Sequence, residues 1–156
     1  MSTLFVDTIN EKTSGNGIKI PGHVVQVVQD VQTGTQVSTS QSYVDITGLS
    51  ASITPTSSSS KIMVQWSING YVPSGHGMVL VPARGSTRFY YDGSDEFEFY
   101  AGSSDLHFRA TNQYLDSPAT ASSTTYKMQL RTTGGSNSQV GSYSYPMTLT
   151  LMEIAQ

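Results

Sequence analysis

The stretch Ile62-Met63-Val64-Gln65-Trp66-Ser67-Ile68 alternates apolar and polar side chains, with Met63 as the exception on the polar side. Successive side chains of a β-strand point to opposite faces, so this alternation predicts a strand with one buried face. Asn69-Gly70 is a turn signal that ends the strand. Trp66 lies in the middle of the apolar series, and we expect it to be a core anchor.

Short apolar segments recur on both sides of this strand, with turn residues between them. They span residues 24–31, 43–46, 77–83, 97–100, 106–108, 125–131 and 147–154. β-Branched residues are abundant, and no segment has the periodicity of an amphipathic helix. We therefore expect an all-β protein, an antiparallel β-sandwich of about eight strands with a jelly-roll-like arrangement.

Three details of these segments lead to further expectations. Valines on both faces of residues 24–31 predict that both faces of that strand are covered. Pro82 interrupts the run 77–83, and proline within a strand favours a sheet edge or a bulge. Met152 and Ile154 flank Glu153 and shift the apolar phase of the last strand, which a bulge or a contact with another subunit would explain.

The first 22 residues differ from the rest of the chain. Two short apolar patches flank the turn signal 13–17, and such a segment buries too little apolar surface to be stable alone. We expect residues 1–22 to form a short extended N-terminal arm for anchoring or subunit exchange, and residues 23–156 to form the sandwich body. The apolar side chains expected to anchor the arm are Leu4, Val6, Ile9, Ile18 and Ile20.

Composition excludes several classes of function. The 156 residues carry a net charge of −3, so no basic field is present to hold a nucleic acid. Cysteine is absent, which excludes disulfides and thiolate metal sites. The chain has neither a signal peptide nor an apolar run long enough to cross a bilayer, so we expect synthesis in a cytoplasm and no membrane insertion.

Side chains capable of catalysis or metal binding form no convincing constellation. His23, His76 and His107 are not paired at ligand spacing, and no nucleophile elbow is present. The acidic run from Asp92 to Glu98 allows calcium binding but departs from the calcium-loop pattern, and a solvated strand face is the ordinary interpretation. We expect no enzyme activity, no cofactor and no metal.

Tyrosines are the better functional lead, because nine of them accompany only 12% charged residues. Their rings and hydroxyls, beside Asn, Gln and Ser, suit contact with glycans or proteins, although tyrosines also fill subunit interfaces. The loop 71–77 is the preferred exposed tip. The candidate surface for a receptor or partner consists of Tyr71, His76, Tyr90, Tyr91, Tyr143 and Tyr145.

The chain also resembles a known family. Several segments are similar to tail-fibre-like structural proteins of marine bacteriophages, notably cyanophages. They are 4–9, 13–18 and 20–28 at the opening, 49–55 with 58–62, Arg84-Gly85-Ser86-Thr87, and 115–119, 124–127 and 149–154. The order of these motifs is more specific than any one of them, and residues 70–112 are the least similar part. The resemblance implies a virion component with a β-sandwich body, usually a homotrimer attached to a tail or capsid.

These observations together predict a phage virion structural protein. We expect a trimeric tail-fibre or fibre-like adhesin subunit, made in the host cytoplasm and released by lysis, with other virion proteins and a host-surface glycan or protein as partners. One alternative is a capsid-decorating or vertex protein of the same fold. A polysaccharide-degrading domain is a more remote alternative, because the chain is short and lacks a solenoid repeat.

Overall fold

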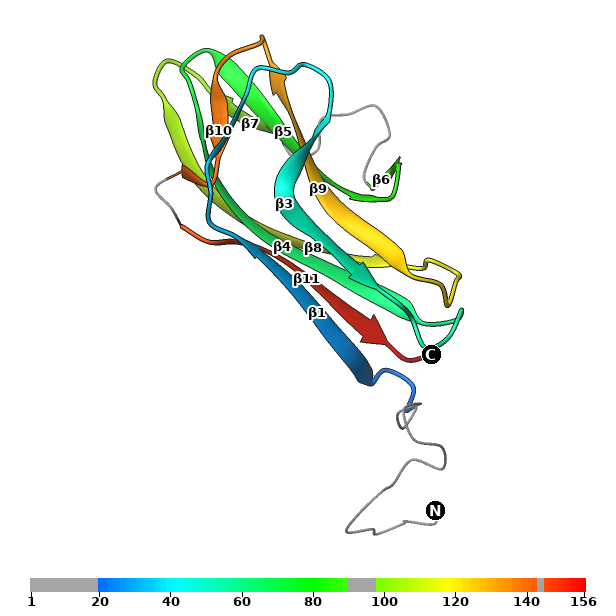
Figure 1. Cartoon of the computed structure of the whole chain (residues 1–156). Coiled ribbons are helices and arrows are strands. Elements are labelled where there is room, and N and C mark those ends of the chain that lie inside the picture. Colours follow the sequence, from blue (N-terminus) through cyan, green and yellow to red (C-terminus); the bar gives the residue numbers. More distant parts are fainter. Residues whose placement is uncertain (1–19, 90–97, 143–144) are drawn as a thin grey trace.

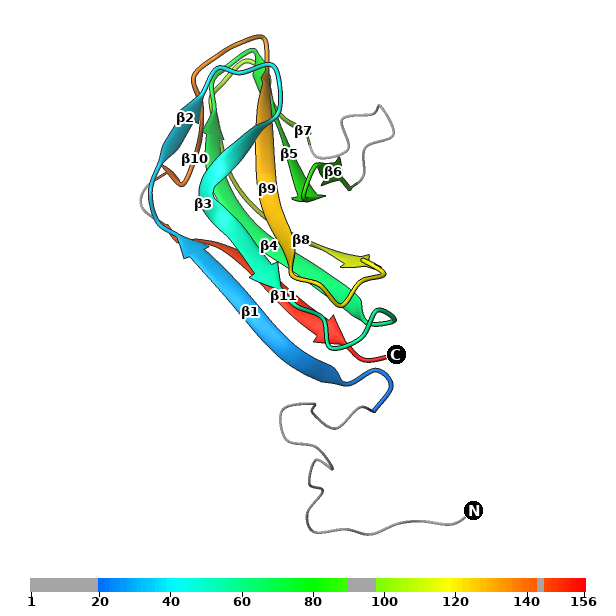
Figure 2. The same ribbon diagram turned by 45° about the vertical axis from the view of Figure 1, so that its right-hand side comes forward.

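The computed structural model describes residues 20–89, 98–142 and 145–156. They form two antiparallel β-sheets that pack face to face (Figure 1, Figure 2), and no α-helix occurs within these ranges. The expected all-β sandwich is therefore confirmed.

The two sheets have the strand order of a jelly roll. Sheet A contains, side by side, β1 (Val24–Gln32), β11 (Met147–Ile154), β4 (Lys61–Val72) and β8 (Leu106–Asp116), and β10 (Ser138–Val140) and β2 (Gln36–Ser38) extend it beside the end of β4. Sheet B contains β3 (Val44–Ile53), β9 (Thr124–Thr133) and β5 (His76–Arg84), and β5 also pairs with β7 (Glu98–Ala101) and β6 (Thr87–Arg88). The first long strand thus lies beside the last, and the remaining long strands alternate between the sheets.

The described ranges hold eleven strands where the sequence predicts about eight. Each of the eight expected segments overlaps a strand of four or more residues. The three additional strands, β2, β6 and β10, have only two or three residues. Segments this short contain too few residues for a period-two pattern, and pairing with a neighbouring strand makes them extended.

The core lies between the sheets, and β4 contributes its central row. Trp66 is 2% exposed and packs in one cluster with Ile62, Val64 and Ile68 of the same strand. Opposite them, sheet B contributes buried side chains that include Tyr126 of β9. The polar positions of β4 therefore face away from sheet B, onto the outer surface of sheet A.

The structure corrects two expectations about β1 and β11, which are neighbouring strands of sheet A. The outward valines of β1 are exposed in the single chain, with Val27 at 57% and Val31 at 51%. The last strand has no phase slip, because Glu153 continues the inward series and is fully buried, while Met152 and Ile154 face outward. The bulge lies instead in β1, between residues 24 and 26.

Pro82 lies where β5 has a strand partner on one side only. It falls between the residues that pair with β7 and those that pair with β6, while β9 covers the other side of β5. Its carbonyl oxygen accepts a hydrogen bond from the Phe89 N–H, on the side away from β9. Pro82 therefore lies at a local sheet edge, where no neighbouring strand needs the N–H that proline lacks. The expected edge position is confirmed.

A candidate binding groove at one end of sheet A

A groove opens on the outer surface of sheet A, near the ends of β4 and β8. One hollow of about 380 Å³ is lined by residues that include Asn69, His107, Arg109 and Tyr145. A second hollow of about 320 Å³ is lined by Tyr71, His107, Gln139 and Ser142. The two hollows share His107 and Ser142, so they adjoin, and we call them together the groove.

Strand alternation places these side chains on one face. Tyr71 pairs with His107, and Asn69 pairs with Arg109, in the register of β4 against β8. Gln139 of β10 lies on the other side of Tyr71. Residues directly opposite in paired strands project to the same face, so three strands deliver aromatic, basic and amide groups to one groove.

The aromatic rings of the groove are held by specific contacts. The rings of Tyr71 and His107 have centroids 5.0 Å apart. The Tyr71 hydroxyl donates a hydrogen bond of 3.0 Å to the Asp105 carboxylate, which also accepts one of 2.9 Å from the Ser74 N–H. The Ser74 N–H first, and then the Tyr71 hydroxyl, lowers the pKa of Asp105, so this carboxylate stays ionised at neutral pH and orients the ring.

Arg109 lies with its guanidinium carbon 4.8 Å from the centroid of the Tyr145 ring. A guanidinium that stacks on an aromatic ring keeps the N–H groups along its edge available for an acceptor such as a carboxylate or hydroxyl. Arg109 forms no ion pair with any acidic residue in the part of the chain that the structure describes. Its donors are therefore available at the side of the groove.

Asn69 contributes an unusual polar atom. Its Nδ2 donates a hydrogen bond of 3.0 Å to the Tyr145 carbonyl oxygen, which fixes the orientation of the amide. The Oδ1 is buried and has no hydrogen-bond partner among the described residues, and the side chain, which is only 4% exposed, lines the groove. A buried acceptor without a donor is costly, so a small rearrangement that brings a donor to this oxygen would be favourable.

Glycine is required beneath the groove at one position. A Cβ added to Gly70 would lie 2.5 Å from the Gln139 carbonyl oxygen and 2.5 Å from the Phe108 ring. The Phe108 ring can stack on Phe99, with centroids 3.9 Å apart, only because position 70 has no side chain. This close packing gives the groove a rigid floor.

The structure brings together only some of the residues expected at a partner surface. Tyr71 and Tyr145 lie in the groove, and the half-buried His76 lies at the start of β5 in sheet B, away from it. In the loop 71–77, which was expected to be an exposed tip, the exposed residues are Ser74 and Gly75. Ile20 is described and 51% exposed. The expected positions outside the described residues are Leu4, Val6, Ile9, Ile18, Tyr90, Tyr91, Tyr143 and the run from Asp92 to Glu96.

Sequence reasoning did not include Asn69, His107, Arg109 or Gln139 in the site. The alternation of His107 and Arg109 in a strand was a usable signal, because it places both on one face. Asn69 was interpreted as part of a turn, yet it lies within β4. Gln139 lies on a three-residue strand that has no sequence pattern of its own.

Two general properties of the described residues complete the description. No group of three or more His, Asp or Glu residues in these ranges could hold a metal ion. The same ranges contain no helix that is long and apolar enough to span a membrane.

Comparisons with known proteins identify no family. No family model matches the chain, and no curated protein matches its sequence significantly. Chains of solved structures do match, and one of them is that of infectious bursal disease virus Gt strain, with 13% sequence identity and a TM-score of 0.34. The alignment covers 98% of this chain and 43% of that chain, so this chain spans less than half of the viral one. A similarity this weak carries no argument about function.

Proposed function

We propose that this chain is a virion structural protein that binds a host surface, a trimeric tail-fibre or fibre-like adhesin subunit. Its role is assembly and attachment, without catalysis. The sequence resemblance to tail-fibre-like proteins of marine bacteriophages motivates the virion assignment. The jelly-roll arrangement agrees with it by analogy alone, because capsid and lectin domains share that architecture and a fold does not imply a function.

The groove is the observation that supports attachment most strongly. Glycans present hydroxyl donors and acceptors together with apolar ring faces, and protein sites for them combine aromatic rings with amides and charged groups. Tyr71, His107 and Tyr145 supply the rings, Arg109 supplies donors, and Asn69 supplies a buried acceptor. We therefore propose a saccharide of the host surface as the ligand of this groove.

The position of the groove in the fold also suits attachment. The segment before β1 and the end of the chain meet through a 2.8 Å hydrogen bond from the Gly22 N–H to the Ala155 carbonyl oxygen. Figure 1 shows this end of sheet A opposite the end that carries β10. Asn69 lies eight positions after Lys61 in β4, a distance of about 26 Å along the strand. An arm that docks at one end would leave the groove facing away from the particle.

Saccharide binding by the full-length protein tests the attachment role. The labelled protein is applied to an array of bacterial surface polysaccharides, and Tyr145→Ala and Arg109→Ala are compared with it. Tyr100→Ala is the matched control, because Tyr100 is 62% exposed and lies on sheet B. We expect the wild-type protein to bind a saccharide. Both groove variants should weaken this binding at least about tenfold, and the control should bind as the wild type does.

A wild-type protein that binds no saccharide, or groove variants that bind as the wild type does, would contradict the attachment role. Immunogold labelling of purified virus particles with an antibody to the chain tests the location. Label on tails supports a fibre, and label spread over shells supports the alternative of a capsid-decorating protein. Particles without label would contradict the virion assignment altogether.

A further inference from the structure

The outer face of sheet A carries four rows of side chains at the end opposite the groove. The register of β1, β11, β4 and β8 places residues of these strands side by side in each row. We call them the basal rows, and they consist of Val24, Ile154 and Lys61; Val27, Met152, Met63 and Leu115; Gln29, Thr150, Gln65 and Gln113; and Val31, Thr148, Ser67 and Thr111.

One of the basal rows is apolar across the entire sheet. It runs from Val27 on one edge strand, through Met152 and Met63, to Leu115 on the other edge strand. Val27 is 57% exposed and Leu115 is 43% exposed, so the row is open at both ends. Single exposed apolar residues are normal on protein surfaces, but a continuous row across four strands marks an interaction surface.

The basal rows carry almost no charge. Lys61 is the one charged residue among them, and none of their fifteen positions is acidic. The chain has a net charge of −3, so the negative charge that would repel a second copy lies elsewhere. The remaining polar side chains are amides and hydroxyls, which both donate and accept hydrogen bonds.

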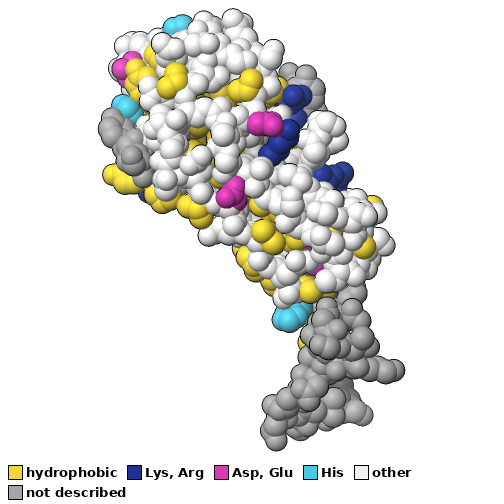
Figure 3. Space-filling view, viewed as in Figure 1, with side chains coloured by type: hydrophobic (Ala, Val, Ile, Leu, Met, Phe, Trp, Pro, Cys, Tyr) yellow, Lys and Arg dark blue, Asp and Glu magenta, His cyan; other side chains and the backbone are white. Residues whose placement is uncertain are grey.

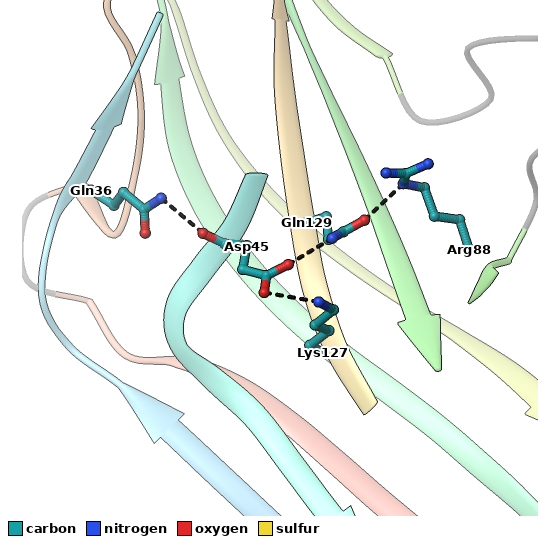
Figure 4. Close-up of polar contacts among 5 residues, drawn as sticks. All are labelled: Gln36, Asp45, Arg88, Lys127 and Gln129. Atoms are coloured by element: carbon teal, nitrogen blue, oxygen red, sulfur yellow. Dashed lines mark hydrogen bonds and ion pairs between the residues drawn. The ribbon is translucent and has the colours of Figure 1, made fainter. Parts of the chain in front are cut away.

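The outer face of sheet B has the opposite character. Asp45 accepts hydrogen bonds from Lys127 at 2.8 Å and from Gln129 at 2.6 Å, and Gln129 accepts one of 2.7 Å from Arg88 (Figure 4). Figure 3 shows basic side chains gathered beside an acidic one over β3 and β9. Charged groups that are paired within the chain and partly hydrated resist burial, so sheet B has the less favourable face for association.

We propose that the basal rows are a self-association surface, on which a second copy of this chain packs its own basal rows. The choice of partner rests on the proposed function, since a fibre subunit associates with itself. Two identical faces that pack on each other form a twofold pair, so this contact is separate from the threefold contact of the proposed trimer. It explains two sequence features that the single chain leaves unexplained. These are the valines on both faces of β1 and the outward Met152 and Ile154 beside the buried Glu153.

Self-complementary chemistry favours a second copy over an unrelated partner. Rows of Gln and Thr can hydrogen-bond to identical rows, and apolar rows exclude water when they meet. Four strands and the seven residues from Lys61 to Ser67 make an area of about 440 Å² per copy. A pair would bury about 900 Å², below the roughly 1,000 Å² of a stable specific interface, so we expect weak association that reverses on dilution.

Matched valine substitutions test the surface. Val27→Lys places a charge at one end of the apolar row, and Leu115→Lys does so on the opposite edge strand. Val37→Lys is the control, because Val37 is 53% exposed on the outer face of sheet A, beside Gln139 and away from the basal rows. Molar mass is measured by light scattering over a dilution series, and circular dichroism melting checks that each variant folds.

We expect the molar mass of the full-length wild-type protein to exceed the 16.8 kDa of one chain and to fall on dilution. Val27→Lys and Leu115→Lys should each raise the dissociation constant at least about tenfold, because a lysine would be buried without a partner, and Val37→Lys should not. A wild type that stays monomeric at all concentrations would overturn the proposal. So would folded basal-row variants that associate as the wild type does.

Removal of residues 1–22 separates this surface from the N-terminal arm. Association that persists without these residues and is lost in Val27→Lys supports the basal rows. Association that depends on residues 1–22 and ignores Val27→Lys assigns the contact to the arm and overturns the proposal. Neither outcome bears on saccharide binding, because Arg109 and Tyr145 lie outside the basal rows. The proposed attachment role is therefore tested separately, by the saccharide-binding experiment.

Discussion

The buried carboxylate of Glu153 allows a direct test of what stabilises the end of the sandwich where β1 begins and β11 ends. Its Oε1 accepts hydrogen bonds from the Thr56 N–H at 2.8 Å and from the Thr56 hydroxyl at 2.7 Å. Its Oε2 accepts one of 2.6 Å from Gln26 Nε2, which also donates to the Thr54 carbonyl oxygen at 2.7 Å. The carboxylate thus joins β1, β11 and the loop before β4.

We expect Glu153→Gln to lower the free energy of unfolding by about 2–3 kcal/mol at pH 7. A hydrogen bond to a charged group contributes about 1.5–3 kcal/mol, and the new amide nitrogen would face a donor instead of offering an acceptor. Gln26 can turn its amide to accept from that nitrogen, but it would then lose its hydrogen bond to Thr54. For a chain of this size the loss corresponds to a melting temperature lower by about 5–10 °C.

The pH dependence distinguishes a charge effect from a packing effect. Burial alone would raise the pKa of Glu153, but hydrogen bonds from Gln26, Ser60 and Thr56 outweigh it and hold the pKa below its ordinary value of 4.5. The stabilisation from the ionised group is complete above pH 4.5 and is lost as the pH falls through the lower pKa of the folded state. The difference in the free energy of unfolding between wild type and Glu153→Gln should therefore become smaller below pH 4.5.

Urea unfolding followed by tryptophan fluorescence measures this difference in the free energy of unfolding at pH 7 and at steps down to pH 3.5. Glu98→Gln is the control, because Glu98 is exposed on β7 and, among the described residues, accepts one hydrogen bond, of 3.1 Å from Thr133. This variant should change stability by less than about 0.5 kcal/mol. A Glu153→Gln protein as stable as the wild type, or a difference of constant size down to pH 3.5, would refute the reasoning.

Three other substitutions test the packing of the sandwich, each measured by urea unfolding. Trp66→Ala should cost about 3–5 kcal/mol, because the side chain is 2% exposed in the core, and an unchanged midpoint would contradict its role there. Tyr126→Phe should cost about 1–2 kcal/mol, because it removes a 2.6 Å hydrogen bond from a buried hydroxyl to Asp116; a larger loss would mean that the ion pair of Asp116 with Arg84 is disturbed as well. Gly141→Ala should lose at least about 2 kcal/mol, because φ is 72° at this position and an added Cβ would overlap the Gly34 carbonyl oxygen; wild-type stability would show that the turn relaxes freely.

Local alternation was sufficient to predict most of the sandwich. The eight expected segments are strands, and the inward series of β4 is the one expected from residues 62–68. Alternation is visible in sequence wherever one face of a strand is buried and the other is open, because adjacent side chains then meet different surroundings. The short strands β2, β6 and β10 lacked this signal.

The expectations for β1 and β11 were wrong because they depended on neighbouring strands. A bulge in β1 and an inward glutamate in β11 depend on what lies beside and beneath those residues. Glu153 breaks the apolar phase in sequence, yet in the fold it continues the inward series because Thr56 and Gln26 satisfy its oxygens. A polar residue at an inward position is accommodated when donors from distant segments reach it, and distance along the chain hides those donors.

The candidate groove was only partly visible for the same reason. Tyrosine enrichment pointed to Tyr71 and Tyr145, but the groove also needs Asn69, His107 and Arg109. These residues belong to segments separated by more than thirty positions, and the pairing of β4 with β8 aligns them. The free acceptor of Asn69 becomes evident only when its neighbours are in place.

Composition and local periodicity therefore specify a charge-poor, cysteine-free β protein with strands at known places, since side-chain type and period-two spacing are properties of the chain itself. The folded arrangement alone determines which faces meet. It buries Glu153, aligns the apolar row from Val27 to Leu115 and gathers the groove, because each depends on register between strands that are distant in sequence.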